Sequence, residues 1–187
     1  MNNYKKNLDL LTRNHVYSKE MEHDACGVGL IASTEGKKSR AVVEYGIEAL
    51  KAVWHRGAVD ADGKTGDGAG IHVEIPKDFF IEKIEVTGHD YDNSEICVGM
   101  IFLPKNDYSS QENCKTIVES ELTKNNFSIY GWRQVPVNPK ILGEKALQTM
   151  PEIIQVLFKS NDPNLLDKNL ERKIYETRKR IENKAFD

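Results

Sequence analysis

Residues 22–30 read EHDACGVGL, and they place Cys26 directly after a small residue and directly before Gly27. A thiol becomes a nucleophile when a nearby base converts it to the thiolate. If residues 1–25 are removed, Cys26 gains an α-amino group with an ordinary pKa of about 7.7–8.0, so that one residue supplies both nucleophile and base. Gly27 leaves room for a substrate backbone to approach. The alternative interpretation is an inert cysteine buried in a core.

The composition indicates a soluble globular protein with one domain or a large part of one. The chain has 187 residues, of which 39% are apolar and 29% charged, and this length suffices for a hydrophobic core. A net charge of −3 argues against nucleic acid as a partner, because phosphate binding favours a basic surface. No apolar run approaches the ~18 residues of a membrane span. The polar N-terminus is not a secretory signal.

Cysteine and histidine usage predicts free thiols and no metal site. Three cysteines stand at positions 26, 97 and 114, without Cys-x-x-Cys spacing. An odd number of cysteines without a secretory signal predicts a reducing, cytoplasmic setting. The five histidines are scattered without ligand spacing, so we expect none of them to bind a metal.

Hydrophobic periodicity predicts alternating strands and helices. Strands are expected at residues 26–33, 71–75, 96–104, 127–137 and 151–160. Helices are expected from Ser39 as N-cap to Gly57, from Ser109 with a capping box, and through Leu166–Ile181. The continuous apolar run at 96–104 is typical of a strand covered on both faces. Strands covered by helices make a layered α/β or α+β domain, although the sequence does not give the strand order.

Two glycine-rich segments invite a comparison with nucleotide-binding loops. GVGLIA, at 27–32, matches G-x-G-x-x-A, but its glycines begin an apolar run instead of following a strand, so the dinucleotide mechanism does not fit. GAVDADGKTGDGAG, at 57–70, has five glycines in fourteen residues and no Gly-Lys-Ser/Thr. We expect this second segment to be an irregular loop on a rigid base, a common place for functional residues.

The cysteine and the glycine-rich loop, taken together, carry a resemblance. ACGVGLIAS (25–33), GIEALKAVWHRGAVDADGKTGDGAGI (46–71), GWRQVPV (131–137), LGEKA (142–146) and PEIIQV (151–156) resemble the glutaminase domain of glutamate synthase large subunits. That domain is a class II glutamine amidotransferase of the N-terminal-nucleophile hydrolase superfamily. The resemblance implies a propeptide at residues 1–25 and the N-terminal part of the amidotransferase domain at 26–187. The implied fold class is α+β, a four-layer αββα sandwich that is incomplete here, because the family's oxyanion-hole residues lie farther along the chain.

The resemblance also implies roles for individual residues. Cys26 matches the catalytic cysteine, whose thiolate attacks the side-chain amide of glutamine, releases ammonia and leaves a thioester that water hydrolyses to glutamate. Arg56 matches the arginine that holds the substrate α-carboxylate, a role suited to a planar bidentate donor. Gly27 and the glycine-rich loop lie against the substrate in this scheme. Asp67 helps to shape that loop, and a plain turn residue is an equally good interpretation.

For the complete enzyme, the resemblance implies glutamate biosynthesis and nitrogen assimilation, with the ammonia used to aminate 2-oxoglutarate. It implies no cofactor in this segment, and FMN and an iron–sulfur cluster in a synthase domain outside it. The implied partners are L-glutamine, the remainder of the large subunit, and a small reductase subunit or ferredoxin. Two alternatives stay open: another class II amidotransferase, and a catalytically silent fragment that keeps the fold as an interaction module.

Overall fold

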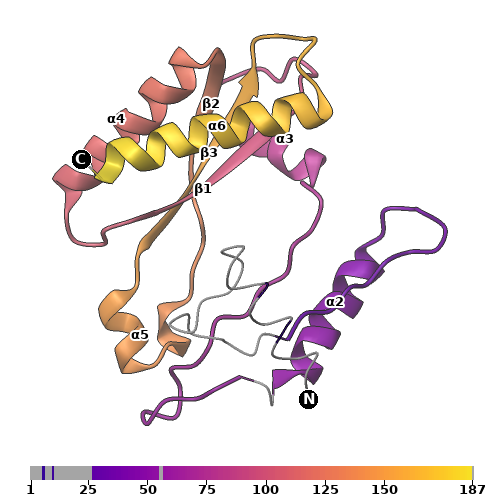
Figure 1. The fold of residues 1–187 in the computed structure, drawn as a ribbon, viewed down its shortest axis with the longest axis vertical. Helices are drawn as coiled ribbons and strands as arrows, with labels where there is room; N and C mark the ends of the chain where they lie inside the picture. The colour runs from indigo at the N-terminus through magenta and orange to yellow at the C-terminus, as the bar shows by residue number, and fades with distance from the viewer. Residues whose placement is uncertain (1–5, 7–9, 11–26, 55–56, 187) are drawn as a thin grey trace. The chain divides into compact units, whose positions relative to one another are not determined.

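The computed structural model describes residues 6, 10, 27–54 and 57–186, which fall into two compact units (Figure 1). The first unit comprises residues 1–58 and 67–71, and its main element is helix α2 (Arg40–Ala52). The second unit comprises residues 59–66 and 72–187 and contains the sheet. No helix among the described residues is long and apolar enough to span a membrane.

Helix α2 begins where the sequence predicts. The Ser39 side chain accepts a 3.1 Å hydrogen bond from the Ala41 amide, which satisfies one of the free amides at a helix N-terminus. The helix ends at Ala52 instead of Gly57, which donates its own 3.0 Å bond to the Trp54 carbonyl. None of the residues of α2 is fully buried. Packing against the described residues therefore does not stabilise further helical turns beyond Ala52.

The strand expected at 26–33 is wrong for the described part, residues 27–33, which are irregular and mostly exposed. The strand expected at 71–75 is also wrong, because these residues are irregular and exposed. An apolar run becomes a strand only when another strand satisfies its backbone hydrogen bonds, and neither segment pairs with a strand of the sheet. Cys26 itself lies outside the described residues.

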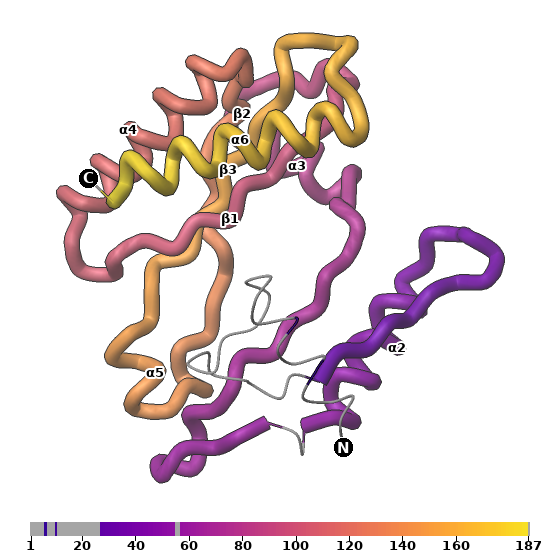
Figure 2. The backbone as a smooth tube through the Cα atoms, viewed as in Figure 1, coloured from indigo at the N-terminus to yellow at the C-terminus, as the bar shows by residue number. Residues whose placement is uncertain are grey.

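The other three predicted strands are confirmed and form one antiparallel sheet. They are β1 (Cys97–Leu103), β2 (Phe127–Gln134) and β3 (Glu152–Ser160), in the order β1-β3-β2. Both outer strands run antiparallel to β3, so they are parallel to each other. Helix α4 (Tyr108–Lys124) connects them across one face of the sheet, as parallel strands require a crossover (Figures 1 and 2).

The central strand has buried residues on both of its faces, which explains its continuous apolar sequence. Val156 and Phe158 belong to the core cluster under α4 and α6 (Asp167–Phe186). Leu157, between them, belongs to the cluster with α3 (Lys77–Val86) on the opposite face. These two clusters form the core of the second unit.

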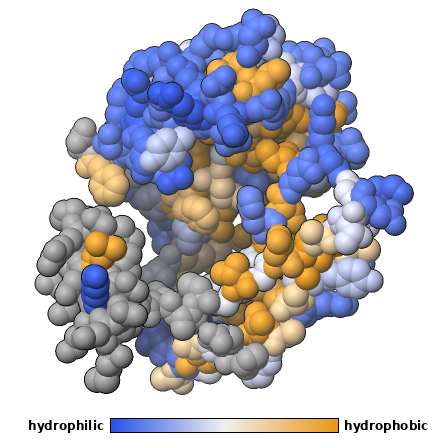
Figure 3. Space-filling model, turned by 45° about the vertical axis from the view of Figure 1, so that its right-hand side comes forward, coloured by the Kyte–Doolittle hydropathy of each residue, from blue (hydrophilic) through white to orange (hydrophobic). Residues whose placement is uncertain are grey.

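The edge strand β1 departs from the prediction that both of its faces are covered. Met100 is 51% exposed and Phe102 64% exposed, because α3 packs only near the Val98 end of this face. Figure 3 shows that apolar side chains are open to solvent on one face of the molecule. The described residues therefore form an α+β structure with a small antiparallel sheet, and a second sheet is not among them.

Helices α4 and α6 allow the buried residues and the N-cap expected from sequence to be compared with the structure. In α4, Val118 and Leu122, which are four residues apart and so lie on one side of the helix, are both buried. Its N-cap is Asp107, which accepts a 3.0 Å bond from the Ser110 amide, so the capping box expected at Ser109 is wrong. In α6, Leu170 is buried and Ile174 and Ile181 pack on the same cluster, whereas Leu166, where the helix was expected to begin, is 51% exposed.

Strand β2 contains a bulge that changes its alternation. Its pairing with β3 passes from Ile129 directly to Gly131, so Tyr130 is an extra residue. Phe127 and Ile129 face the α4 side, and Trp132 packs on the same side after the bulge. Side chains of a regular strand alternate between its two faces; in β2 this alternation holds only up to the bulge, because one extra residue shifts all later side chains by one position.

Candidate functional site

Two of the predicted site residues, Cys26 and Arg56, lie outside the described residues. Gly27 lies in an irregular, exposed segment. Asp67 is the predicted site residue whose contacts are defined: its carboxylate accepts a 2.9 Å hydrogen bond from the Ala58 amide. The Asp67 amide in turn donates a 3.2 Å bond to the Ala58 carbonyl. These two bonds join the ends of residues 58–67 and fit both interpretations of Asp67, as a residue that shapes the loop for substrate and as a plain turn residue.

The glycine-rich loop is more regular than the sequence indicates. An antiparallel bridge joins Val59 to Gly66, directly beyond the Ala58–Asp67 pair. The Asp60 amide continues this pattern with a 2.7 Å bond to the Thr65 carbonyl. We call residues 58–67 the glycine hairpin. Its backbone hydrogen bonds give it a defined geometry, and the prediction of wholly irregular structure is wrong for this part of the loop.

The tip of the glycine hairpin is organised by one carboxylate. Asp62 Oδ1 accepts hydrogen bonds from the amides of Lys64 (2.9 Å) and Thr65 (2.7 Å), and its Oδ2 accepts a 2.6 Å bond from the Thr65 hydroxyl. The Thr65 hydroxyl contributes most, and these amides add to it, in holding the pKa of Asp62 well below its usual range. Gly63 occupies the turn with φ 68°, a conformation that glycine adopts at little cost.

This tip contacts the segment that opens helix α5 (Glu144–Thr149), about eighty residues later in the chain. Lys145 donates a 2.6 Å ion-paired hydrogen bond to Asp60. A Cβ atom added at Gly143 would overlap the Thr65 hydroxyl, the Thr65 amide nitrogen and the Asp62 carboxylate. Sequence reasoning singled out LGEKA as a motif but did not connect it with the glycine-rich loop. The one clue in the sequence was that LGEKA and the glycine-rich loop both contribute to the resemblance to the same family.

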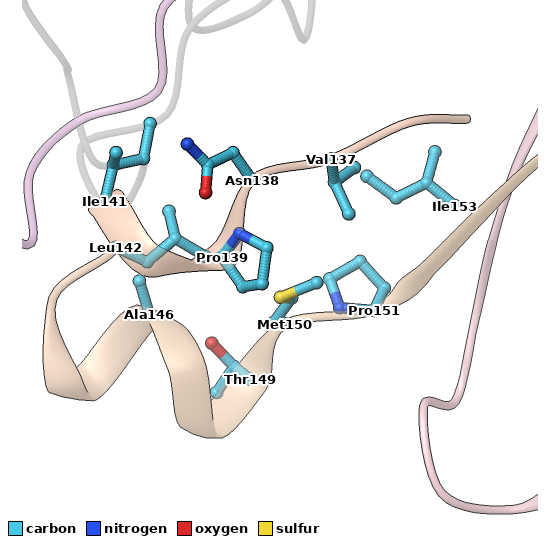
Figure 4. A pocket seen from close by; sticks show the side chains of 10 residues that line it. All are labelled: Val137, Asn138, Pro139, Ile141, Leu142, Ala146, Thr149, Met150, Pro151 and Ile153. Carbon is cyan, nitrogen blue, oxygen red and sulfur yellow. The ribbon is translucent and has the colours of Figure 1, made fainter.

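A groove of about 430 Å³ lies beside this segment, between 3₁₀ helix η2 (Pro139–Ile141), α5 and the beginning of β3 (Figure 4). Its ten lining residues carry no acid, base or thiol, and most are apolar, among them Val137, Leu142 and Ile153. The groove therefore offers apolar contact and no group for acid–base or nucleophilic chemistry.

The cysteines among the described residues, Cys97 and Cys114, are free thiols. Burial is the main cause that raises the pKa of Cys97 to about 12, so this thiol is protonated and unreactive near neutral pH. Cys114 is partly exposed on α4. Among the residues that the structure describes, no group of His, Cys, Asp and Glu side chains could hold a metal ion.

Comparison with known proteins identifies the family. The family model for class-II glutamine amidotransferases matches residues 26–187. The chain is similar to the glutamate synthase [NADPH] large chain of Azospirillum brasilense, with 52% identity over 96% of this chain and 12% of the relative. It is also similar to ferredoxin-dependent glutamate synthase 1, chloroplastic/mitochondrial, of Arabidopsis thaliana, with 41% identity over 86% of this chain and 10% of the relative.

The ferredoxin-dependent glutamate synthase of Pyropia yezoensis is 37% identical over 92% of this chain. The chain spans 10–12% of the length of these relatives. Because the family model covers most of the chain, and the glycine hairpin and LGEKA segment both fall within it, the chain belongs to the class II glutamine amidotransferases.

Proposed function

We propose that this chain is the N-terminal part of the glutaminase domain of a glutamate synthase large chain, and that the domain hydrolyses L-glutamine to L-glutamate and ammonia. The observation that carries the proposal is the similarity to glutamate synthases along 96% of the chain at 52% identity. The match to the family model begins at residue 26, which supports a domain that starts at the cysteine and a propeptide at residues 1–25.

The proposed nucleophile is Cys26 with its own α-amine as base. The amine accepts the thiol proton while the sulfur attacks the side-chain amide carbon of glutamine, and it then returns the proton to the departing ammonia. The product at this stage is a γ-glutamyl thioester. Water adds to the thioester carbonyl and displaces the Cys26 thiol, which yields glutamate and restores the enzyme.

Substrate binding is assigned to Arg56, Gly27 and Asp67. The Arg56 guanidinium pairs with the substrate α-carboxylate through two parallel hydrogen bonds, and Gly27 allows close approach of the substrate. Asp67 acts through the backbone. Its bonds to Ala58 close the glycine hairpin two residues after Arg56, which supports a role in shaping the site.

We further propose that the complete domain has the four-layer αββα architecture. The uncovered side chains of Met100 and Phe102 on β1 support a further layer against this face, because contiguous apolar surface favours burial. We assign FMN, the iron–sulfur cluster and the contacts with a small reductase subunit or ferredoxin to other parts of the complete cytoplasmic enzyme. There the ammonia would aminate 2-oxoglutarate in nitrogen assimilation.

The test is the intact mass of the complete protein, with and without a diazo-ketone analogue of glutamine. The proposal predicts a chain that begins at Cys26 and gains a single adduct on that residue. Cys26→Ser should abolish both the adduct and glutaminase activity, whereas Cys114→Ser, a matched change of a partly exposed thiol on α4, should keep both. A Cys26→Ser protein with undiminished glutaminase activity would contradict the proposal, and absence of any adduct would indicate a silent module.

A further inference from the structure

Residues 59–66 of the glycine hairpin belong to the second unit, and within that unit they contact the start of α5. The contact joins Asp60 to Lys145, 85 residues apart. Bringing such distant residues together costs loop-closure entropy. The contact between the hairpin and α5 therefore requires that the side chains and backbone of the two segments are complementary in shape and charge.

The fit at Gly143 is steric. The hairpin tip approaches the Gly143 backbone so closely that a Cβ would overlap atoms of both Asp62 and Thr65, one of them a backbone nitrogen. Backbone atoms cannot move aside as the end of a flexible side chain can. Any residue other than glycine at this position therefore pushes the tip away from α5.

The fit at Lys145 is electrostatic. Its ammonium group binds the Asp60 carboxylate at 2.6 Å, and the Lys145 side chain remains 63% exposed. The other Asp60 oxygen accepts a 2.6 Å bond from the Ala61 amide within the hairpin. Asp60 thus connects the hairpin backbone to α5, and the partial exposure of the pair limits the strength of this connection.

We propose that Gly143 and Lys145 are positioning residues for glutamine binding, which hold the tip of the glycine hairpin, residues 60–65, against the start of α5. This inference rests on the proposed function, in which the residues immediately before the hairpin bind the substrate carboxylate. One residue, Gly57, separates Arg56 from Ala58, the first residue of the hairpin, so the Cα atoms of these two residues are at most about 7 Å apart along the chain. Neither positioning residue touches substrate.

The first experiment measures amide hydrogen exchange of residues 60–65 in the complete protein. The expected result for Gly143→Ala is exchange at least tenfold faster in the hairpin, with β3 amides unchanged. Lys145→Met should accelerate the same amides about twofold to fivefold, as the loss of a partly exposed ion pair allows. Lys145→Arg should restore wild-type exchange, and Lys140→Met is the matched control, because Lys140 is exposed on η2.

The outcomes of this experiment are distinct. If Gly143→Ala also accelerates exchange in β3, the variant is unfolded and Lys145→Met with its Lys145→Arg rescue decides the question. If hairpin exchange is the same in wild type, Lys145→Met and Lys140→Met, α5 does not hold the hairpin and the inference is overturned.

The second experiment measures glutaminase kinetics of the same proteins. A positioning role predicts that Lys145→Met raises KM for glutamine about twofold to fivefold, by the same loss of ion pairing, while kcat stays within twofold, and that Lys145→Arg reverses the change. A purely structural role would lower the active fraction, hence kcat, and leave KM unchanged, which would overturn the inference. If the wild-type protein hydrolyses no glutamine, the proposed function itself fails, while the exchange data still report whether α5 holds the hairpin.

Discussion

The Tyr130 hydroxyl donates a 2.8 Å hydrogen bond to the Asp92 carboxylate, and this bond ties the bulge of β2 to the segment between α3 and β1. Lys159, on the neighbouring strand β3, forms an ion pair with the same carboxylate. The Thr87 hydroxyl donates a 2.8 Å bond to the Tyr130 carbonyl. The extra residue of the bulge is therefore held through both its side chain and its backbone.

Asp92→Asn should make stability less dependent on acid pH. The Lys159 ammonium, followed by the Tyr130 hydroxyl, holds the pKa of Asp92 well below its usual range. A folded-state pKa that is lowered contributes stability above the unfolded-state value of about 3.9, and this stability is lost as pH falls below it. Urea unfolding at pH 7 and at successive steps below pH 4 should show a smaller loss in Asp92→Asn than in wild type. Because Asp92 is 44% exposed, we expect an effect below about 1 kcal/mol; Asp90→Asn, an exposed neighbour, should behave as wild type.

Gly131→Ala should destabilise the second unit by about 1–3 kcal/mol, the usual cost of overpacking. A Cβ at this position would lie 2.7 Å from the Thr87 methyl group, and Gly131 has φ 151°. Gly46→Ala is the matched control, because nothing lies within 4 Å of an added Cβ in α2. There alanine should slow exchange of the helix amides, since glycine in a helix interior costs about 0.5–1 kcal/mol. Equal stability of wild type and Gly131→Ala would show that Thr87 can move aside.

Leu157→Ala should cost about 2–5 kcal/mol of the free energy of unfolding, because it leaves a cavity in a closed core. Leu157 is 0% exposed and Met100, on the neighbouring strand, is 51% exposed. In the 187-residue chain, where the described residues leave this face uncovered, Met100→Ala should therefore cost much less, and comparison of the two urea midpoints checks the difference. Similar losses in both variants would mean that the face bearing Met100 is covered in solution.

Cys97 should resist alkylation in the folded protein at pH 8. The residue Cys97 is 5% exposed. The pKa of its thiol, raised by burial to about 12, leaves almost no thiolate at that pH. Cys114, which is partly exposed, should react faster under the same conditions. Mass spectrometry after a short pulse of iodoacetamide gives the two rates, and denaturant should abolish the difference. Preferential labelling of Cys97 without denaturant would contradict the buried environment.

A strand could be predicted from the sequence where the burial of its residues leaves a recognisable run of apolar residues within the strand itself. The apolar run of β3 is continuous because Val156 and Leu157 bury on opposite faces, and this pattern is visible without knowledge of its neighbours. Residues 71–75 alternate apolar and polar side chains, which is another local strand pattern, but they have no partner strand, and partners cannot be read from a single segment. Helix α3 was missed because only Phe80 and Ile84 of its ten residues are buried, too few to make a stripe.

The candidate site was predictable as a set of motifs and not as a set of contacts. The glycine-rich loop and LGEKA could both be recognised, and Asp67 could be named as a loop-shaping residue. The bonds from Asp67 to Ala58 and the approach of Gly143 to Thr65 depend on tertiary folding. Contacts between residues so far apart leave no periodic signal, because neither segment has a pattern that depends on the other.

The position of β3 also governs how this chain can fold during its synthesis. Every pairing within the sheet includes β3, which ends at Ser160. At translation rates of about 5–20 residues per second, β1 therefore leaves the ribosome seconds before any partner exists, with an apolar sequence and both edges open. Such unpaired edges promote aggregation. Protection of the nascent chain by a chaperone would matter most in the interval between the synthesis of Leu103 and that of Ser160.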